Sequence, residues 1–455
     1  MWKNSLFIDW IAKNRYNIYK EGEKMERKFT EKLNIWKNEY INIPFMLIGA
    51  RQTGKTYIIK KFCRENFENQ IYINFDENDV YESFFEGSLN PEDIINKIST
   101  FLGYKIDIEN TILFFDEIQK SERAINSLKY FCESEKPYKI ICAGSLLGVK
   151  INRYTSSFPV GKVRIEYLYP LDFEEFLWAM KEDLLSDEIH RCYEKMEPMN
   201  KALHEKALNL YKTYLCTGGM PASINELISK NKDIILYSND IKENILTAYI
   251  ADMSKYTTSS EAIKVREIYK SIPIQLGKEN QKFQYKVISS NARSRDYESS
   301  IEWLIQSGII LECNLVKTPK MPLEIYKESK IFKLYLSDCG LLMNLAKISI
   351  TSMLNDVNML YKGIIAENYV AQTLKSKGKP LYYYENNSKA EIDFLLNIDD
   401  EIIPVEVKAS DNTFSKSLSA YVNKYKPKYA IRISSKNFGI SNNIKSIPLY
   451  AVHLI

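Results

Sequence analysis

A strand–loop–helix pattern near the amino end restricts the possible folds of this chain more than any other feature. The segment from residue 44 to 62, PFMLIGARQTGKTYIIKKF, passes from apolar residues through a glycine-containing loop into a run suited to a helix. The loop fits the pattern G-x-x-x-x-G-K-[ST] at every fixed position and reads Gly49, Ala50, Arg51, Gln52, Thr53, Gly54, Lys55, Thr56. The glycines let backbone N–H groups turn inward around phosphates, and the positive end of the helix points at the same anion. We therefore expect a nucleotide site, with Lys55 reaching the β- and γ-phosphates and Thr56 holding Mg²⁺.

A second apolar run, in the segment NTILFFDEIQK, ends in Asp116 and Glu117. It fits a strand buried on both faces, with the two acids at its carboxyl end. We expect Asp116 to hold the Mg²⁺ shell and Glu117 to polarise the attacking water. A further apolar run, residues 140–143, would deliver Ser145 beside the γ-phosphate. Polar groups at the carboxyl ends of several strands are typical of a doubly wound α/β sheet, so the pattern predicts binding and hydrolysis of ATP.

Length and composition limit the number of domains and the classes of function that the chain can have. A chain of 455 residues is expected to form two to four domains, and a net charge of +4 gives no general argument for nucleic-acid binding. The seven cysteines contain no C-x-x-C pair, which indicates reduced thiols and a cytoplasmic location. The three histidines, His190, His204 and His453, are far apart and show no ligand pattern, so we expect no metal site from them. No segment approaches a membrane span, and no secretory leader is recognisable.

The order of the patterns predicts several domains. Residues 1–24 precede a second methionine, Met25, and are either an amphipathic helix or an upstream extension. We expect a P-loop ATPase core at 25–180, a helical region at 181–260, a winged-helix-like module at 261–350 and a nuclease-like α/β domain at 351–455.

Residues 261–350 read as helices followed by two returning strands, which is the order of a winged-helix module. Five basic residues of this region could meet phosphates: Arg293, Arg295, Lys317, Lys320 and Lys327. The expected recognition helix, however, also carries acids that phosphates would repel: Asp296, Glu298 and Glu302. Both DNA reading and a role in internal packing or partner binding stay open, and the acids favour the second.

The last hundred residues contain a second set of chemically active side chains. Glu367 lies on an expected helix, and the segment AEIDFLLNIDDEIIPVEVKAS reads as a hairpin with strands at 392–397 and 402–408. Asp393 is on the first strand, and Glu406 and Lys408 face the same side of the second because strands have a period of two.

These residues suit metal-dependent cleavage of phosphodiesters. Asp393 and Glu406 would hold Mg²⁺, with Mn²⁺ as the alternative ion and Glu367 as a further ligand, while Lys408 orients the water. The residues that follow form a basic surface suited to DNA: Lys416, Lys424, Lys426, Lys428, Arg432 and Lys436. An ordinary solvated hairpin is the alternative interpretation.

Taken together, the motifs GARQTGKT, LFFDEIQ, AGSLLG, GGMP, DMSKY, AENYVAQTL and EIDFLL…VEVKAS resemble a family of prokaryotic AAA+-like ATPases related to the archaeal ATPase group. The resemblance runs from about Met25 to the end. It implies ATP binding by Gly49 to Thr56, Mg²⁺ handling by Asp116, water activation by Glu117 and a γ-phosphate sensor at Ser145.

The resemblance also implies a C-terminal domain similar to the PD-(D/E)xK nucleases, with Asp393, Glu406 and Lys408 in the motif positions. Ile392 stands where that pattern has a proline. No arginine is clearly marked as a finger. Arg153 and Arg164 are the candidates, and whether hydrolysis needs a neighbouring subunit of a homo-oligomer stays open.

Three functions remain to be distinguished. The leading hypothesis is an ATPase whose nucleotide state controls a nuclease-like domain directed at nucleic acid. The alternative is an ATP-driven regulatory switch whose C-terminal domains only bind DNA or a protein partner. A signal-transducing ATPase with no nucleic-acid role is the third.

Overall fold

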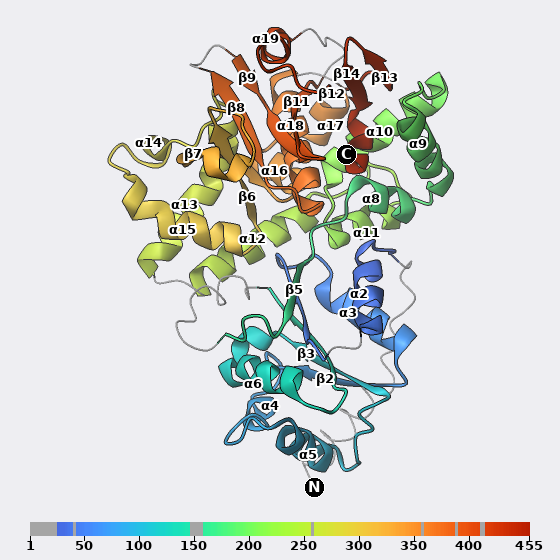
Figure 1. Ribbon diagram of the computed structural model, residues 1–455, viewed down its shortest axis with the longest axis vertical. Helices are drawn as coiled ribbons and strands as arrows, with labels where there is room; N and C mark the ends of the chain where they lie inside the picture. The colour runs from blue at the N-terminus through green and yellow to red at the C-terminus, as the bar shows by residue number, and fades with distance from the viewer. Residues whose placement is uncertain are drawn as a thin grey trace. The chain divides into compact units, whose positions relative to one another are not determined.

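The computed structural model describes residues 25–39, 42–145, 158–255, 259–355, 359–386, 390–409 and 415–455. The chain forms two compact units (Figure 1). The first contains Met1–Gly49 and Gly54–Leu168, and the second contains Ala50–Thr53 and Tyr169–Ile455. Residues 169–180, which we expected in the ATPase core, are thus part of the second unit. The predicted extension 1–24 lies outside the described residues.

The first unit is built on a five-stranded sheet in the order β2-β3-β4-β1-β5. Its strands are β1 (Phe45–Ile48), β2 (Asn69–Asn74), β3 (Thr111–Asp116), β4 (Lys139–Gly144) and β5 (Arg164–Tyr167). Every neighbouring pair is parallel, which confirms the predicted parallel α/β sheet. The strands β1, β3 and β4 end at the same edge, so their carboxyl-terminal residues lie near one another.

Helices cover both faces of this sheet. They are α2 (Phe29–Asn38), α3 (Lys55–Asn66), α4 (Val80–Ser83), α5 (Pro91–Leu102), η1 (Ile118–Lys120) and α6 (Glu122–Glu133). Phe45 and Leu47 pack with α2 and α3, while Met46 and Ile48 pack with α5 and α6 on the other face. Because both faces are buried, β1 is apolar at every position instead of alternating.

The second unit begins with helices. Its helical segments are α8 (Phe173–Ala179), α9 (Asp183–Lys195), α10 (Lys201–Thr217), α11 (Pro221–Ser229), α12 (Asp240–Lys255), α13 (Ser259–Leu276), α14 (Tyr285–Ile288), α15 (Ser294–Gln306), η2 (Leu323–Tyr326), α16 (Cys339–Leu345), α17 (Ile350–Leu354), α18 (Met359–Ser376), α19 (Lys416–Tyr425) and η3 (Leu449–Leu454). Asp172 caps α8 in a capping box with Glu175. The glycine pair Gly218 and Gly219 separates two helices, since α10 ends at Thr217 and Pro221 begins α11.

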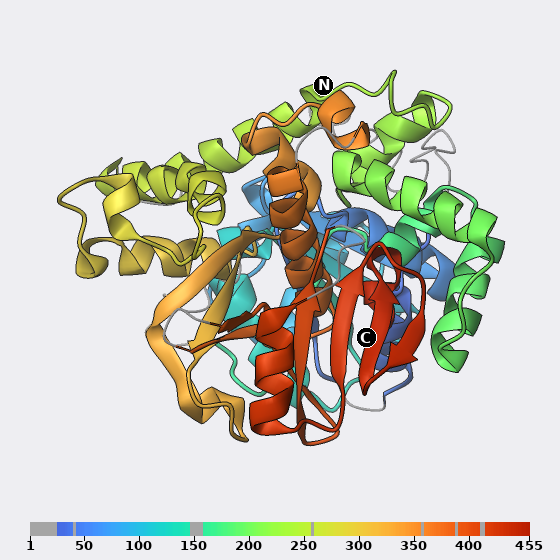
Figure 2. The ribbon, with the colours of Figure 1, turned by 90° about the horizontal axis from the view of Figure 1, so that it is seen from above.

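Two sheets follow in the second unit. Their strands are β6 (Ile310–Val316), β7 (Lys327–Leu336), β8 (Tyr382–Asn386), β9 (Ala390–Ile392), β10 (Phe394–Ile398), β11 (Glu401–Val407), β12 (Ala430–Ser434), β13 (Gly439–Ser441) and β14 (Ile444–Pro448). The first sheet has the order β7-β6-β8-β9, and the second has the order β10-β11-β12-β14-β13 (Figure 2).

The β6–β7 hairpin, which we expected to be the wing, is not a free two-stranded element. It is antiparallel as predicted, but β6 also pairs in parallel with β8. The reason is that β6 is buried almost throughout, so it takes partners on both edges. The hairpin is therefore half of a four-stranded sheet that includes residues assigned by sequence to the nuclease-like domain, and the winged-helix interpretation is not confirmed.

The C-terminal hairpin has the predicted turn. Asp399 and Asp400 both have positive φ, at 52° and 61°, which is the geometry of a tight two-residue connection between antiparallel strands. The expected first strand, 392–397, is instead divided between β9 and β10 at Asp393. Asp393 is thus at a break between two strands and not inside one, because its carboxylate accepts a hydrogen bond from the Val407 N–H at 2.6 Å.

Candidate functional site

The phosphate loop connects β1 to α3 and requires glycine at its first position. Gly49 has a φ of +146°, and a Cβ atom there would lie 2.4 Å from the Leu168 carbonyl oxygen. Gly54, the residue before α3, also has a positive φ of 93°. Lys55 is buried, and its Nζ donates to the Gly49 carbonyl at 2.9 Å. The loop geometry therefore places the lysine ammonium against the turn that would surround a phosphate.

The two predicted Mg²⁺ residues of the first unit lie together. The Thr56 hydroxyl donates to the Asp116 carboxylate at 2.9 Å, and the Tyr72 hydroxyl donates to the same oxygen at 3.0 Å. Burial and the neighbouring Glu117 raise the pKa of Asp116, and the hydrogen bonds from Thr56 and Tyr72 oppose that rise. A hydroxyl and a carboxylate are the hard oxygen donors that suit Mg²⁺, so these residues fit the ion.

Glu117 and Ser145 follow the carboxyl ends of β3 and β4. Glu117 has a positive φ of 50° and accepts a hydrogen bond from the Gln119 amide. Ser145 is buried, and its hydroxyl has no hydrogen-bond partner among the described residues. An unsatisfied buried hydroxyl at this edge of the sheet fits the predicted role of a γ-phosphate sensor.

Tyr72 is a residue that the sequence reasoning missed. It lies on β2 beside Phe114 of β3, and Lys60 Nζ lies 3.7 Å from the centre of its ring. The segment QIYINFDE reads as a strand in the sequence, but its place beside the acidic strand comes from the structure. What the sequence does not show is that its hydroxyl reaches Asp116.

Arg51, at a variable position of the loop, has partners within the second unit. Its Nε lies 2.5 Å from the Asp252 carboxylate, and the Tyr249 hydroxyl donates to its carbonyl oxygen at 3.1 Å. Tyr249 and Asp252 are both on α12, and Asp252 is buried. Sequence reasoning assigned no contact to DMSKY, the segment that contains Asp252, although it contributed to the family resemblance.

Of the two arginine-finger candidates, only Arg164 lies in the part of the chain that the structure describes. Arg153 lies outside the described residues. Arg164 begins β5 and is opposite Phe45, the first residue of β1, so it lies at the end of the sheet away from the phosphate loop. It forms an ion pair with Glu39 at 2.6 Å. Arg164 is therefore not placed to reach the nucleotide site of its own chain.

The second predicted set of residues is gathered in the second unit. Lys408 Nζ lies 2.7 Å from the Glu406 carboxylate, as the period of two predicts, and Ser415 donates to the same oxygen at 2.9 Å. Phe394 of β10 is opposite Val405 of β11. Asp393, the residue before Phe394, and Glu406, the residue after Val405, are therefore neighbours across the two strands. Burial and the charges of Glu406 and Glu367 raise the pKa of Asp393 well above its usual value. Glu367, Asp393, Glu406 and Lys408 thus share one electrostatic environment.

Lys333 of β7 is a member of this cluster that the sequence reasoning missed. Its Nζ lies 3.0 Å from Glu367 and 2.5 Å from Glu391, and its side chain is fully buried. Tyr335, two residues along β7, donates to Glu367 at 2.5 Å. Burial lowers the pKa of Lys333, but the charges of Glu367, Glu391 and Asp393 outweigh this and raise it. The cluster therefore contains its own buried cation.

The predicted metal ligands of this cluster do not converge closely. Among the described residues, the one group of histidine, cysteine and acidic side chains with all ligand atoms within 4.8 Å of one another is Glu174, His190 and His453. The carboxylates of Glu367 and Asp393 are thus not gathered with Glu406 to that distance. Even so, Oε2 of Glu406 is buried without a hydrogen-bond partner among the described residues, which fits a cation near it.

The basic residues that were expected to meet DNA phosphates mostly have acidic neighbours. Lys317 forms an ion pair with Glu328 at 3.2 Å, and Lys327 forms one with Glu324. Arg295 Nε lies 3.8 Å from the Asp296 carboxylate. These local pairs offset the positive charge that a phosphate backbone would need.

Residues 42–177 match the AAA domain family. Together with the phosphate loop and the parallel sheet, this match supports an ATPase-type function. Residues 208–352 and 362–452 match two domains of unknown function, DUF8612 and DUF4143.

No curated protein matches the chain. Solved structures that resemble it include a Walker-type ATPase of Pyrococcus abyssi, at 14% identity and a TM-score of 0.45, covering 72% of this chain and 97% of that one. Another is the ORC2 protein of Aeropyrum pernix in ADPNP and ADP complexes, at 12% identity and a TM-score of 0.34, covering 76% and 98%. A third is Cdc6p of Pyrobaculum aerophilum, at 12% identity and a TM-score of 0.29, covering 76% and 98%. None of the described helices is both long and apolar enough to cross a membrane.

Proposed function

We propose that this chain hydrolyses ATP at Gly49–Thr56 with the help of Asp116 and Glu117. The observation that carries the proposal is the hydrogen bond of 2.9 Å between Thr56 and Asp116, because it joins the end of the phosphate loop to the acidic end of β3. Thr56 and Asp116 would hold Mg²⁺, which neutralises the negative charge that develops on the phosphates.

Each remaining residue has a definite task in this proposal. Lys55 moves from the Gly49 carbonyl to the β- and γ-phosphates when nucleotide binds. Glu117 orients a water and accepts its proton, and the Ser145 hydroxyl donates to the γ-phosphate. These groups act by positioning and charge, which are the main sources of catalysis in phosphoryl transfer.

Steady-state release of phosphate from ATP tests this proposal. We expect Lys55→Ala to abolish turnover and to weaken nucleotide binding. Arg64→Ala, a matched change at an exposed cation on the same helix α3, should leave both unchanged. Turnover by Lys55→Ala at the wild-type rate, or no Mg²⁺-dependent turnover by the wild type, would overturn the proposal.

We also propose that the buried cluster of the second unit cleaves phosphodiester bonds and is directed at DNA under nucleotide control. Support comes from three carboxylates, Glu367, Asp393 and Glu406, that lie in one buried environment with Lys408. Asp393 and Glu406 would hold Mg²⁺ or Mn²⁺, with Glu367 as a further ligand. Lys408 would hold the water, since its ammonium already contacts Glu406.

The alternative is a regulatory switch that binds DNA or a protein partner without cleavage. The specific observation that favours it is Lys333, whose buried ammonium already balances Glu367 and Glu391. Lys333 thus already supplies a positive charge to Glu367, one of the residues proposed to bind the metal ion.

A cleavage assay distinguishes the nuclease from the regulatory switch. It uses linear, single-stranded and branched DNA with Mg²⁺ or Mn²⁺, in the presence and absence of ATP. We expect cleavage that Lys408→Ala abolishes and Lys55→Ala alters, while Lys347→Ala, at an exposed lysine of the same unit, changes nothing. Salt-dependent DNA binding without cleavage would favour the switch. ATP hydrolysis with neither binding nor cleavage would indicate a signalling ATPase.

A further inference from the structure

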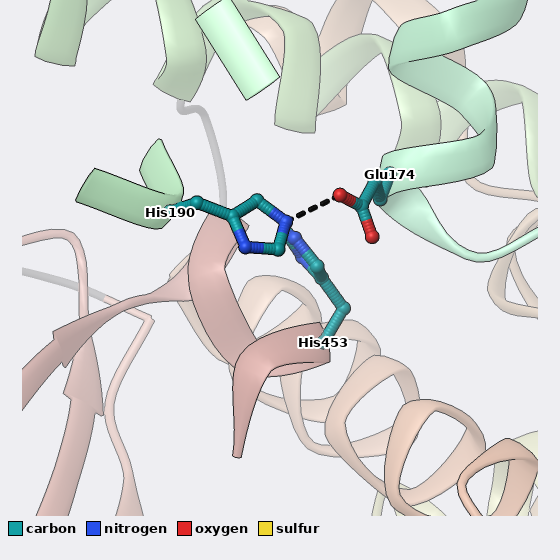
Figure 3. A group of neighbouring side chains, drawn as sticks. All are labelled: Glu174, His190 and His453. Carbon is teal, nitrogen blue, oxygen red and sulfur yellow. Dashed lines mark hydrogen bonds and ion pairs between the residues drawn. The ribbon is translucent and has the colours of Figure 1, made fainter. Parts of the chain in front are cut away.

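Three side chains from distant parts of the sequence meet within the second unit. Glu174 is on α8, His190 is on α9 and His453 is on η3. Their ligand atoms all lie within 4.8 Å of one another. Figure 3 shows Nε2 of the His190 ring hydrogen-bonded to the Glu174 carboxylate, with the His453 ring directly beside them. His190 and His453 are far apart in the sequence, as noted above, but folding brings them together, whereas His204 is not part of the group.

The donor set is specific in its chemistry. Two imidazole nitrogens and one carboxylate oxygen are a ligand combination of Zn²⁺ and related transition metals, whereas Mg²⁺ and Ca²⁺ prefer oxygen alone. Three protein ligands leave the fourth tetrahedral position for water. Water can reach the group from the side of His190, whose side chain is 42% exposed, whereas Glu174 and His453 are buried.

Neighbouring contacts hold the three side chains in place. The Ser186 hydroxyl, one turn before His190 on α9, donates to the Glu174 carboxylate at 3.2 Å. The Phe173 ring packs against the His453 ring with centroids 6.2 Å apart. Lys377 donates to the His453 carbonyl oxygen at 2.6 Å and so fixes η3. Such outer contacts orient metal-binding side chains and strengthen their affinity.

We propose that Glu174, His190 and His453 form a binding site for one Zn²⁺ ion, and that the ion fastens η3 to α8 and α9. Histidine and carboxylate ligands must be deprotonated to bind a metal ion, so the affinity for Zn²⁺ should weaken as the pH falls. The site is separate from the residues assigned to ATP hydrolysis and to the acidic cluster, and it does not depend on either proposed activity.

Zinc titration of untagged, chelator-treated protein, followed by calorimetry, tests the site. We expect one Zn²⁺ per chain, and Co²⁺ should give the strong visible absorption of a tetrahedral ion. His190→Ala, Glu174→Gln and His453→Gln should each weaken binding at least tenfold. Zinc should raise the Tm of the wild type and not that of these variants.

His204→Gln is the matched control, because it removes the third histidine of the chain. His204 contacts the Tyr450 hydroxyl at 2.7 Å and the Ser435 carbonyl oxygen at 3.0 Å, and it is not part of the group. This variant should bind zinc as the wild type does. His190 is partly exposed on a helix, so His190→Ala should fold even if His453→Gln does not.

Two results would overturn the proposal. One is a wild type that binds no stoichiometric zinc while His190→Ala lowers its Tm, which would show a hydrogen-bonded pair alone. The other is zinc binding that survives in both His190→Ala and Glu174→Gln, which would place the ion elsewhere.

Discussion

At the scale of single residues, the buried ammonium of Lys333 depends on its ion pairs. Its ammonium is fully buried and lies within ion-pair distance of two carboxylates, Glu367 and Glu391. Removing one partner of a buried ion pair leaves the other charge uncompensated, which is more destabilising than the pair itself is stabilising.

Lys333→Met should therefore lower the free energy of unfolding by about 3 kcal/mol. The double variant Lys333→Met/Glu367→Gln should recover part of that loss, since it removes the buried charge that the single change leaves behind. Urea unfolding of the set, as a double-mutant cycle, measures both. A Lys333→Met protein as stable as the wild type would show that the cluster does not need its internal cation.

Lys242 is a buried lysine whose pKa is lowered, whereas that of Lys333 is raised. Burial lowers its pKa to about 8, against weaker opposing effects of Cys216, Asp338 and Cys339. Its Nζ donates to the Cys216 carbonyl oxygen at 2.5 Å. Between pH 8 and its ordinary value of 10.5 the unfolded chain binds more protons at this residue than the folded chain does. Stability from this group therefore rises with pH in that window and is lowest below pH 8.

The free energy of unfolding of the wild type, relative to Lys242→Met, should increase by about 2 kcal/mol from pH 7.5 to pH 10. Denaturant unfolding of both proteins across that range gives the difference, in which titrations common to the two cancel. A difference that stays constant or falls would show that the folded protein keeps Lys242 charged to high pH.

At the scale of elements, the break between α10 and α11 depends on glycine. A Cβ atom on Gly219 would lie 2.0 Å from the Leu171 carbonyl oxygen, and its N–H donates to the buried Asp338 carboxylate at 2.7 Å. Asp338 also caps α16 by accepting from the Leu341 N–H at 2.9 Å. One tight turn thus joins three helices.

Gly219→Ala should lower the Tm sharply, by an amount equivalent to about 2–4 kcal/mol, because backbone must move to admit the methyl group. The control is Gly363→Ala within α18, where a Cβ atom would meet nothing within 4 Å. That change should stabilise the protein by up to about 1 kcal/mol through helix propensity. Equal Tm values for the two variants would contradict the close packing at Gly219.

Local patterns in the sequence were sufficient to predict the helices, strands and turns in which they occur. The apolar run before Gly49, the two acids at the end of β3 and the hairpin in the last hundred residues all predicted what the structure shows, because short-range sterics and burial decide these features. Pairings between distant segments were not predictable in this way. Nothing in the sequence near β6 indicates that β8 pairs with it, and nothing near Lys333 identifies Glu391 as its partner.

The same limit applies to the candidate sites. Thr56 and Asp116 could be assigned to one site because each belongs to a motif with a known place on a parallel sheet. His190 and His453 belong to no motif, and only the packing of η3 brings them to Glu174. A search by residue spacing finds ligands on one element, whereas these three ligands come from three elements.

At the scale of the whole molecule, most of the residues proposed to bind and hydrolyse ATP belong to a different unit from the acidic cluster. Asp116 and Glu117 lie in the first unit, and Asp393 and Glu406 lie in the second. Residues Ala50–Thr53 are part of the second unit through contacts such as those of Arg51 with α12. The Arg51–Asp252 pair thus connects this loop to α12, and we predict that it passes a change of nucleotide on to α12.

Asp252→Asn should weaken that connection while leaving Lys55, Thr56 and Asp116 unchanged. We expect ATP turnover to persist while the effect of ATP on the second unit, measured by hydrogen exchange in α12, is reduced severalfold. Unchanged exchange in α12 on ATP addition to the wild type would show that the pair does not carry nucleotide information.

The most direct test of ATP hydrolysis is the comparison of wild type with Glu117→Gln in binding and single-turnover hydrolysis of MgATP. Glutamine keeps the size of the side chain but cannot accept the proton of the attacking water. We predict equal affinity for MgATP and hydrolysis slower by about 10²–10⁴-fold in the variant. Hydrolysis by Glu117→Gln at the wild-type rate would contradict the assignment of Glu117, and a wild type that binds MgATP without hydrolysing it would contradict the account as a whole.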